Sequence, residues 1–575
     1  MKRNLQFILS AVVLTSLILA ACAPAATPAP VPSVPPQPTA VPPTAAPAPT
    51  AAPAFQPMVV SAPDCNYGTS DNPAEFKSIA ALDANTVQFT LCHPDPAFAS
   101  KVAFNVFAIQ SKSYLDANGG DSVKMSVNPN GTGPYMLKEW VHGDHITYVA
   151  NPNYWGTPPL AKTVILRWST EAAQRLLELQ AGTADGIDNP SPDDFAKIQS
   201  DTTLKLYPRP AINIFYIGFQ DTMKPFDNEQ VRQAIAMAID RKHIVDTFYP
   251  AGSLVAEQFV PPSLEPGFTA GFSWYPYDPA GAKKLLAAAG YPNGFSTTLS
   301  YRDVVRGYLP LPGKVAQEIQ AELKQIGVNV KLDVMESTAF LDATSKGQKP
   351  FYMLGWSVDY PDSTDFYDYH FANAANLQFG TPFSDLVSAI HAGGQVSDPA
   401  QRQKDYDQVN TLIKQHVPMI PVAHGASAVA YKASVQGAFA SPLSDEYFAV
   451  MSNGTDQLVF MQNGEPGAIW CSDETDGESL RACLQLYDTL LSYQLGGVAI
   501  QPGLAQTYEA NSDASQWTFH LRPGVKFSNG DVLSANDVVA TYASQWDASS
   551  PNHKGRTGDF SYFGAFFGAF LNAKK

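Results

Sequence analysis

The sequence predicts a mixed protein of the α/β or α+β class, with long helices between short strands. Short runs rich in β-branched and aromatic residues alternate with longer helical patterns, and no fixed repeat period is present. The 47 prolines argue against an ordinary helical bundle, because proline lacks a backbone donor and breaks helix interiors. With 575 residues, the chain has room for three or four domains.

The clearest strands are runs of β-branched or aromatic residues at 86–91, 328–332 and 517–521. The clearest helices are predicted at 171–181, 228–240, 279–289, 314–325 and 398–415. The stretch 560–570 holds six aromatic residues in eleven. Because so much exposed aromatic surface would favour association, we expect this stretch to be buried.

The first 21 residues predict a lipoprotein signal peptide. A short basic start, Met1-Lys2-Arg3, precedes an apolar stretch from Leu5 to Ala21 that is marginally short for a bilayer span. The segment Leu19-Ala20-Ala21-Cys22 resembles a bacterial lipobox, in which the thiol of Cys22 accepts a diacylglycerol. A plain signal peptide or an N-terminal anchor helix is the alternative.

Residues 22–57 predict a Pro/Ala/Thr-rich tether. The stretch from Ala23 to Pro57 contains thirteen prolines and too few large apolar groups to form a core. We therefore expect an extracytoplasmic, lipid-anchored body that is held clear of the membrane.

The four cysteines of the body are expected to lie in an oxidising space, where they can pair in three ways. We favour a local bond between Cys471 and Cys483, which leaves Cys65 with Cys92. Two unbonded pairs are the alternative.

Composition and motifs exclude several classes of function. The formal charge of −16 argues against nucleic-acid binding. The Gly313-Lys314 pair is followed by valine and forms no P-loop. The segment 477–481 lacks the second glycine of a hydrolase elbow. His142 and His145 lie in a turn-like segment without a further ligand cluster, so we predict no metal, no cofactor and no catalytic residue.

Four turn-rich or helical motifs occur together, at 130–135, 151–156, 225–235 and 355–361. As a set they resemble family 5 extracellular solute-binding proteins, the dipeptide, oligopeptide and nickel group of ABC importers. The resemblance covers nearly all of residues 64–575. It implies a periplasmic-binding-protein-like fold with two main lobes and an additional third domain, and a monomer that binds its ligand without catalysis.

The order of the segments departs from that family. The segment 502–530 resembles one that lies upstream of the strand 86–91 in the family, but here it comes later. We therefore interpret the chain as a circular permutant, since surface loops tolerate such cuts. A misassembled gene and a fusion to part of a second copy are the alternatives.

Seven segments follow from this interpretation. They are a signal peptide (1–21), the tether (22–57), an extra lobe (58–155), a hinge lobe (156–215), a second ligand-binding lobe (216–430), the rest of the hinge lobe (431–492) and the rest of the extra lobe (493–575). Residues 64–155 and 493–575 are expected to pair into one lobe.

The resemblance also implies a peptide site. In peptide-binding relatives, the aspartate of the Gly-Trp-x-x-Asp segment pairs with the ligand ammonium, and the matching residue is Asp359. Trp356 would form a wall of this pocket, next to Tyr360. A role for Asp359 as a turn cap is the alternative.

The ligand carboxylate is bound by an arginine in dipeptide-binding members, and the matching residue is Arg306, with Tyr308 as a pocket tyrosine. Arg302 is a competing candidate, and a solvated surface role for Arg306 is a further alternative. Thr475 and Asp476 match residues that line the cleft from the hinge lobe.

The expected function is that of a lipid-anchored receptor that captures short peptides by hinge closure. It would deliver them to a separate permease and ATPase. The alternatives are an oligosaccharide, an opine-like compound or a nickel chelate as ligand, a secreted lipoprotein hydrolase, and a chemosensory or adhesion role.

Overall fold

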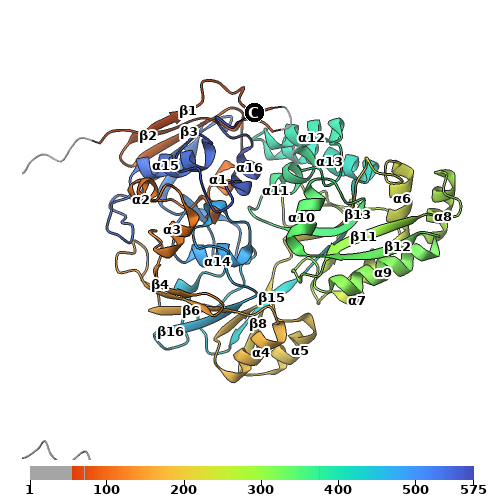
Figure 1. Cartoon of the computed structure of the whole chain (residues 1–575), viewed down its shortest axis with the longest axis horizontal. Coiled ribbons are helices and arrows are strands. Elements are labelled where there is room, and N and C mark those ends of the chain that lie inside the picture. The colour runs from red at the N-terminus through yellow and green to blue at the C-terminus, as the bar shows by residue number, and fades with distance from the viewer. Residues whose placement is uncertain (1–54, 70–71, 374–375, 575) are drawn as a thin grey trace, which may run out of the picture. The chain divides into compact units, whose positions relative to one another are not determined.

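The structure is a computed structural model that describes residues 55–69, 72–373 and 376–574 (Figure 1). The signal peptide, Cys22 and nearly all of the tether lie outside these described residues. Residues Phe55–Lys575 form one compact unit. Within the described ranges, no helix is long and apolar enough to cross a membrane.

A five-stranded sheet joins segments that are far apart in the sequence (Figure 1). Its order is β1 (Val59–Ser61), β2 (Phe76–Asp83), β3 (Thr86–Leu91), β20 (Gln516–Leu521) and β19 (Ala505–Ala510). β3 and β20 are antiparallel, and Gln88 donates to Thr518 across 430 positions of sequence. Segments from 58–155 and 493–575 therefore share one sheet.

The aromatic stretch 560–570 packs on this sheet, through helix α16 (Ser561–Phe567). The ring of Phe76 lies 5.8 Å from Phe563 and 4.9 Å from Phe567, between ring centroids. Each such pair contributes ~0.5–1.5 kcal/mol beyond burial of area. The predicted burial is confirmed, because Phe560, Phe563, Phe566 and Phe567 are all buried.

A seven-stranded sheet lies next along the chain. Its order is β4 (Tyr135–Val141), β5 (His145–Ala150), β6 (Thr163–Trp168), β16 (Gln457–Gln462), β7 (Gly186–Asp188), β15 (Ser427–Lys432) and β8 (Leu204–Arg209). β5 pairs antiparallel with β6, so the predicted boundary at 155 falls in a turn between two neighbouring strands. The five-stranded and seven-stranded sheets also share one hydrophobic core. The extra lobe and the hinge lobe are therefore one packed body, which we call the first body.

A six-stranded sheet forms a second body with its own core. Its order is β10 (Leu254–Val255), β14 (Met419–His424), β9 (Asn213–Phe219), β13 (Phe351–Ser357), β11 (Ser296–Arg302) and β12 (Asn329–Met335). The predicted boundaries at 215 and 430 fall inside β9 and β15 and are misplaced. β9 is buried along its whole length and β15 is buried at all but its end residues, so hydrophobicity alone does not reveal where the chain leaves one sheet for the other.

The five predicted helices are confirmed, with ends that differ by at most a few residues. They are α4 (Ala172–Ala181), α6 (Glu229–Ala238), α8 (Pro279–Ala288), α9 (Pro312–Gln325) and α13 (Pro399–His416). The side chains of Asn228 and Asp398 cap α6 and α13 by accepting backbone hydrogen bonds.

Further α-helices and one π-helix were not among those predicted. They are α1 (Phe98–Lys101), α2 (Lys112–Asn118), α3 (Ser122–Val127), α5 (Phe195–Ser200), α7 (Arg241–Phe248), α10 (Ser337–Ser345), α11 (Ser363–Tyr367), the π-helix η3 (Asp368–Ala372), α12 (Ser384–Gly394), α14 (Gly477–Leu484) and α15 (Ala535–Trp546). A small two-stranded sheet joins β17 (Leu491–Tyr493) to β18 (Ile500–Pro502). Disulfides link Cys65 to Cys92 and Cys471 to Cys483, which is the pairing favoured from the sequence.

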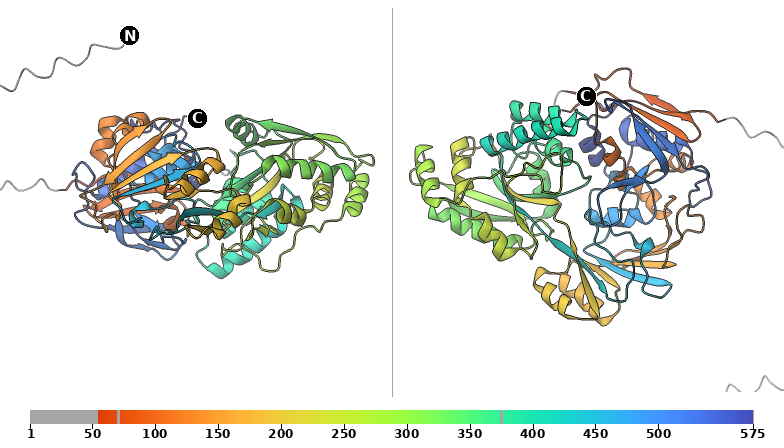
Figure 2. Two further views of the ribbon diagram at one scale, coloured as in Figure 1. Left: turned by 90° about the horizontal axis from the view of Figure 1, so that it is seen from below. Right: turned by 180° about the vertical axis from the view of Figure 1, so that it is seen from behind.

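The chain passes twice between the two bodies, from β8 to β9 and from β14 to β15 (Figure 2). The amide of Asn213 joins the two crossings, because its Nδ2 donates to the carbonyl of Gly425 and its Oδ1 accepts from the Gly425 N–H, both at 2.8 Å. A Cβ at Gly425 would lie 2.2 Å from the carbonyl oxygen of Gly307. Any side chain at this position would therefore clash with the backbone of the loop that carries Gly307 and Tyr308.

Candidate functional site

The candidate site begins where β13 ends and the chain turns into α11. Asp362 caps α11, since its side chain accepts from the backbone of Thr364 at 3.0 Å. Arg402 holds the same carboxylate at 2.8 Å. The turn-cap role that the sequence left open for Asp359 therefore belongs to Asp362, three residues later.

Asp359 is buried, with 8% of its surface exposed. Its Oδ1 accepts a hydrogen bond from the Tyr562 hydroxyl at 2.9 Å, whereas its Oδ2 is buried without a partner. Burial raises the pKa of Asp359 to about 8, against the opposing effect of the Tyr562 hydrogen bond. Near neutral pH, this carboxyl therefore lacks a positive partner that would stabilise its charged form.

Asp365 places a second buried carboxyl beside Asp359. Its Oδ2 accepts from the backbone N–H of Asp359 at 3.0 Å, and its Oδ1 accepts from the Trp356 indole at 3.3 Å. Burial, followed by the charge of Asp359, raises the pKa of Asp365 well above its usual range. Among the described residues, neither carboxyl forms an ion pair with a basic side chain.

Aromatic side chains surround these carboxyls. Trp356 stacks on Tyr369, with 4.7 Å between ring centroids and 24° between planes, and meets His370 edge-on at 4.9 Å. Tyr360 is buried against Phe566 of α16 at 4.5 Å. Tyr360 thus packs at the contact between the two bodies, while Trp356 lies next to the carboxyls.

The two arginine candidates have different surroundings. Arg302 donates to Ser337 at 2.8 Å and to the hydroxyl of the buried Tyr308 at 3.1 Å. Among the described hydrogen bonds, the guanidinium of Arg306 donates only to the adjacent carbonyl of Val305. The guanidinium of Arg302 therefore bonds two neighbouring side chains. That of Arg306 bonds only a backbone carbonyl and has more donors left for a ligand.

Among the described hydrogen bonds, the two hinge-lobe candidates, Thr475 and Asp476, form none with Asp359 or Asp365. Thr475 is exposed, and Asp476 caps α14 by accepting from the backbone of Ser479 at 2.8 Å. The structure thus gives Asp476 a structural role. The segment of His142 and His145 also agrees with its expected role as a polar turn, because His142 bonds Glu465 and His145 bonds Asp144.

Sequence reasoning missed Tyr562, which comes from a segment 203 positions away from Asp359. The loop that leads to Tyr562 is held by Asp473, whose carboxylate accepts from the backbone of Arg556 at 2.8 Å, Gly558 at 2.9 Å and Phe560 at 2.8 Å. The glycines at 555 and 558, both with positive φ, were the available signal for such a wrapped loop.

Two α/β bodies joined by two crossing segments, with buried carboxyls where the bodies meet, define the class of periplasmic-binding-protein-like receptors. The family model of bacterial extracellular solute-binding proteins, family 5 Middle, matches residues 40–378 and 499–561. The chain therefore belongs to this family of solute-binding proteins, which bind their ligands and are not enzymes.

Curated relatives and a solved structure agree with this assignment. The chain is 30% identical to the dipeptide-binding protein of Escherichia coli over 66% of this chain and 72% of that protein. It is 32% identical to heme-binding protein A of Haemophilus influenzae over 66% and 71%, respectively. It also resembles a dipeptide-binding protein from Pseudoalteromonas in complex with Met-Leu, with a TM-score of 0.58, 26% identity and coverage of 64% of this chain and 73% of that one.

Proposed function

We propose that the protein captures short peptides and that Asp359 binds their terminal ammonium group. The observation that carries this proposal is the buried Oδ2 of Asp359, which has no partner, beside a second carboxyl that also lacks a basic partner. A ligand ammonium would supply the missing charge and donors. The similarity to dipeptide-binding proteins supports the same ligand class.

Arg306 is our candidate for the peptide carboxylate. Its guanidinium is less committed than that of Arg302, and the neighbouring Gly307 packs against the Gly425 crossing. An ammonium partner and a carboxylate partner together would select zwitterionic ligands. Pockets lined by Trp356 would then accept varied side chains.

Ligand capture would proceed by closure about the two crossing segments. Among the described residues, only the β8–β9 and β14–β15 connections carry the chain between the two bodies, and Asn213 holds these connections together through its amide. Short connections of this kind absorb a hinge motion while the two cores move as units. The ligand would stabilise the closed form through contacts that both bodies provide.

Delivery would be to an ABC permease with its ATPase. In this proposal the body works outside the cytoplasm as a monomer, and Cys22 carries the lipid anchor. Labelling with a radioactive fatty acid should mark the wild-type chain and not Cys22→Ala. Equal labelling of both chains would reject the anchor.

The ammonium role is tested by calorimetric titration with di- and tripeptides. Asp359→Asn should weaken binding by ~2–5 kcal/mol, or roughly 30- to 4000-fold, because the ammonium loses its buried counter-charge. Peptides with an acetylated N-terminus should bind both proteins equally weakly. Asp303→Asn, an exposed carboxyl near Arg306, is the matched control and should bind as wild type does. Unchanged affinity in Asp359→Asn would remove Asp359 from the site.

The carboxylate role is tested with C-terminally amidated peptides. Arg306→Gln should weaken binding of free peptides and leave amidated peptides unaffected, whereas Arg302→Gln should reduce stability through Tyr308 and Ser337. If Arg302→Gln instead weakens binding of free peptides and leaves amidated peptides unaffected, Arg302 rather than Arg306 binds the peptide carboxylate.

Heme is a second candidate ligand, favoured by the 32% identity to heme-binding protein A. Thermal-shift screening of residues 58–575 should include short peptides, hemin, sugars and nickel salts, because a ligand that binds the native state raises Tm. A rise in Tm with hemin, and with none of the other compounds, would make heme rather than peptides the ligand.

We also propose that the chain is a circular permutant of its family. The pairing of β3 with β20 and the isolated bridge between Ala74 and Gly568 bring the rearranged segments together. A variant in which residues 493–574 are moved ahead of residue 58 should keep the Tm and the ligand affinity. A variant that fails to fold in this order would contradict the proposal.

A further inference from the structure

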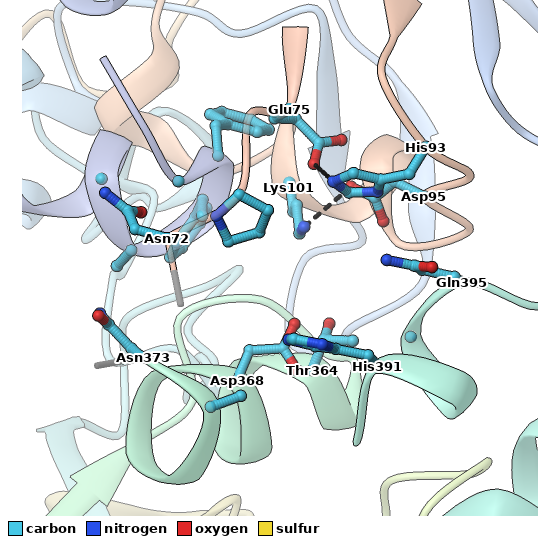
Figure 3. A pocket seen from close by; sticks show the side chains of 18 of the residues that line it. Asn72, Glu75, His93, Asp95, Lys101, Thr364, Asp368, Asn373, His391 and Gln395 are labelled. Atoms are coloured by element: carbon cyan, nitrogen blue, oxygen red, sulfur yellow. Dashed lines mark hydrogen bonds and ion pairs between the residues drawn. The ribbon is translucent and has the colours of Figure 1, made fainter. Parts of the chain in front are cut away.

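A second pocket lies between the two bodies, apart from the peptide site (Figure 3). The first body contributes Glu75, His93, Asp95 and Lys101, and the second contributes Thr364 and Asp368. We call this the junction pocket. Its volume is about 90 Å³, far below the ~300–1,000 Å³ of typical ligand pockets, so a peptide does not fit.

The junction pocket is separate from Asp359, which is not among its lining residues. Phe566 contributes to its lining and packs on Tyr360, the residue that follows Asp359. Thr364 lines the pocket and accepts from the Tyr360 hydroxyl at 3.0 Å. The Tyr360–Phe566 contact is thus placed between the two sites.

Two basic side chains of the pocket, Lys101 and His93, are already paired within the first body, and His391 lines the pocket from the second. The Lys101 ammonium lies 2.8 Å from the Asp95 carboxylate, and the His93 imidazole lies 3.0 Å from the Glu75 carboxylate. Although burial alone would lower it, the Glu75 charge raises the pKa of His93 to about 9. Both bases are therefore charged near neutral pH, and each balances one acid.

Asp368 is the third acid and faces this pair of ion pairs from the second body (Figure 3). Among the described residues it forms no ion pair, and its Oδ1 is buried without a hydrogen-bond partner. Glu75 is only 4% exposed, and its Oε1 also lacks a partner. Two carboxylate oxygens that need donors therefore line one small cavity, one from each body.

We propose that the junction pocket binds a small organic ammonium ion, of the size of methylammonium, between Asp368 and Glu75. Its N–H groups match the unpartnered carboxylate oxygens of Asp368 and Glu75, one from each body. A metal ion is the poorer match, because the described residues contain no group of three His, Cys, Asp or Glu side chains able to hold one. The bound ion would add a further contact between the two bodies.

The experiment is a thermal-shift titration at about pH 8.5, above the pKa of Asp368, which burial raises to about 7 against the effect of Lys101. Methylammonium chloride is compared with tetramethylammonium chloride at equal ionic strength. At tenfold above its Kd, methylammonium should raise Tm of the wild type by roughly 1–3 °C, and tetramethylammonium, which has no N–H group, should not. Calorimetric titration of the wild type gives the Kd independently of any variant.

Asp368→Asn should abolish the methylammonium shift, and Glu75→Gln should reduce it. Asp342→Asn, which removes an exposed carboxylate of α10 that pairs with Lys346, is the matched control and should keep the full shift. Equal shifts from the two ammonium salts, or an unchanged shift in Asp368→Asn, would overturn the proposal. An equal shift from potassium chloride would also overturn it, in favour of an alkali-metal site.

Discussion

The molecule contains two clusters of buried acids that differ in charge balance. Beside the seven-stranded sheet of the first body, Asp188 and Glu446 share Arg209 and Arg481, with all four ion pairs between 2.6 and 3.0 Å. Where the bodies meet, Asp359 and Asp365 lie side by side without a base.

The pKa values of the two clusters move in opposite directions. Burial favours the protonated form of Asp188, but Arg481 and Arg209 outweigh burial and lower its pKa. Burial raises the pKa of Asp359 to about 8, against the opposing effect of the Tyr562 hydrogen bond. A balanced cluster is complete without a ligand, whereas an unbalanced one is stabilised by a cation from outside. This is the difference that we expect between a structural cluster and the binding site proposed at Asp359.

The strongest test of this contrast removes one base from the balanced cluster. Arg481→Ala leaves two buried acids with only Arg209, so the free energy of unfolding should fall by ~3–5 kcal/mol. Urea denaturation measures this change. Arg167→Ala, which breaks the more exposed pair with Glu178, is the control and should lose only ~0–1 kcal/mol. Similar losses in both variants would remove the distinction between the clusters.

A second test uses pH. The Asp359 pKa is 3.8 in the unfolded chain and about 8 in the folded one, so between these values the folded state binds one more proton. Stability should therefore fall as pH rises through this window, by up to ~1.4 kcal/mol per unit from this group. Asp359→Asn should make the decline between about pH 5 and pH 7 shallower, as measured by urea denaturation at each pH. An unchanged slope would show that Asp359 has an ordinary pKa.

The smallest expected effect concerns Tyr562. Tyr562→Phe removes one hydrogen bond to Asp359 and should lower stability by ~0.5–1.5 kcal/mol near neutral pH. Because that bond favours the charged carboxylate, the Asp359 pKa should also rise further. NMR titration of a carboxyl-labelled sample would detect the shift, and a lowered pKa would contradict the assigned geometry.

Much of the fold could be predicted from local patterns. The helix 279–289 carries Pro279 in its first turn, and the strand 86–91 alternates buried and partly exposed residues, as periodicity requires. The limits of the bodies could not be predicted in this way. β9 is buried along its whole length, so its sequence contains no mark where the chain leaves the seven-stranded sheet.

The candidate site also contains residues that the sequence could reveal and residues that it could not. Asp359 and Trp356 lie in one short segment and could be found together, and Asp365 follows six residues later. Tyr562 could not be found, because only the tertiary fold brings α16 to that segment. Local sequence also could not choose between Arg302 and Arg306, which differ in their contacts rather than in their spacing.

The pairing of β3 with β20 has a consequence for biosynthesis. The ribosome produces β20 some 430 residues after β3, so most of the chain is translated before the middle of the five-stranded sheet can close. Until then the apolar faces of Phe76 and Phe89 have no partner from α16 or β20. We expect nascent chains to depend on chaperones during this interval, since exposed strand edges and apolar surface favour aggregation.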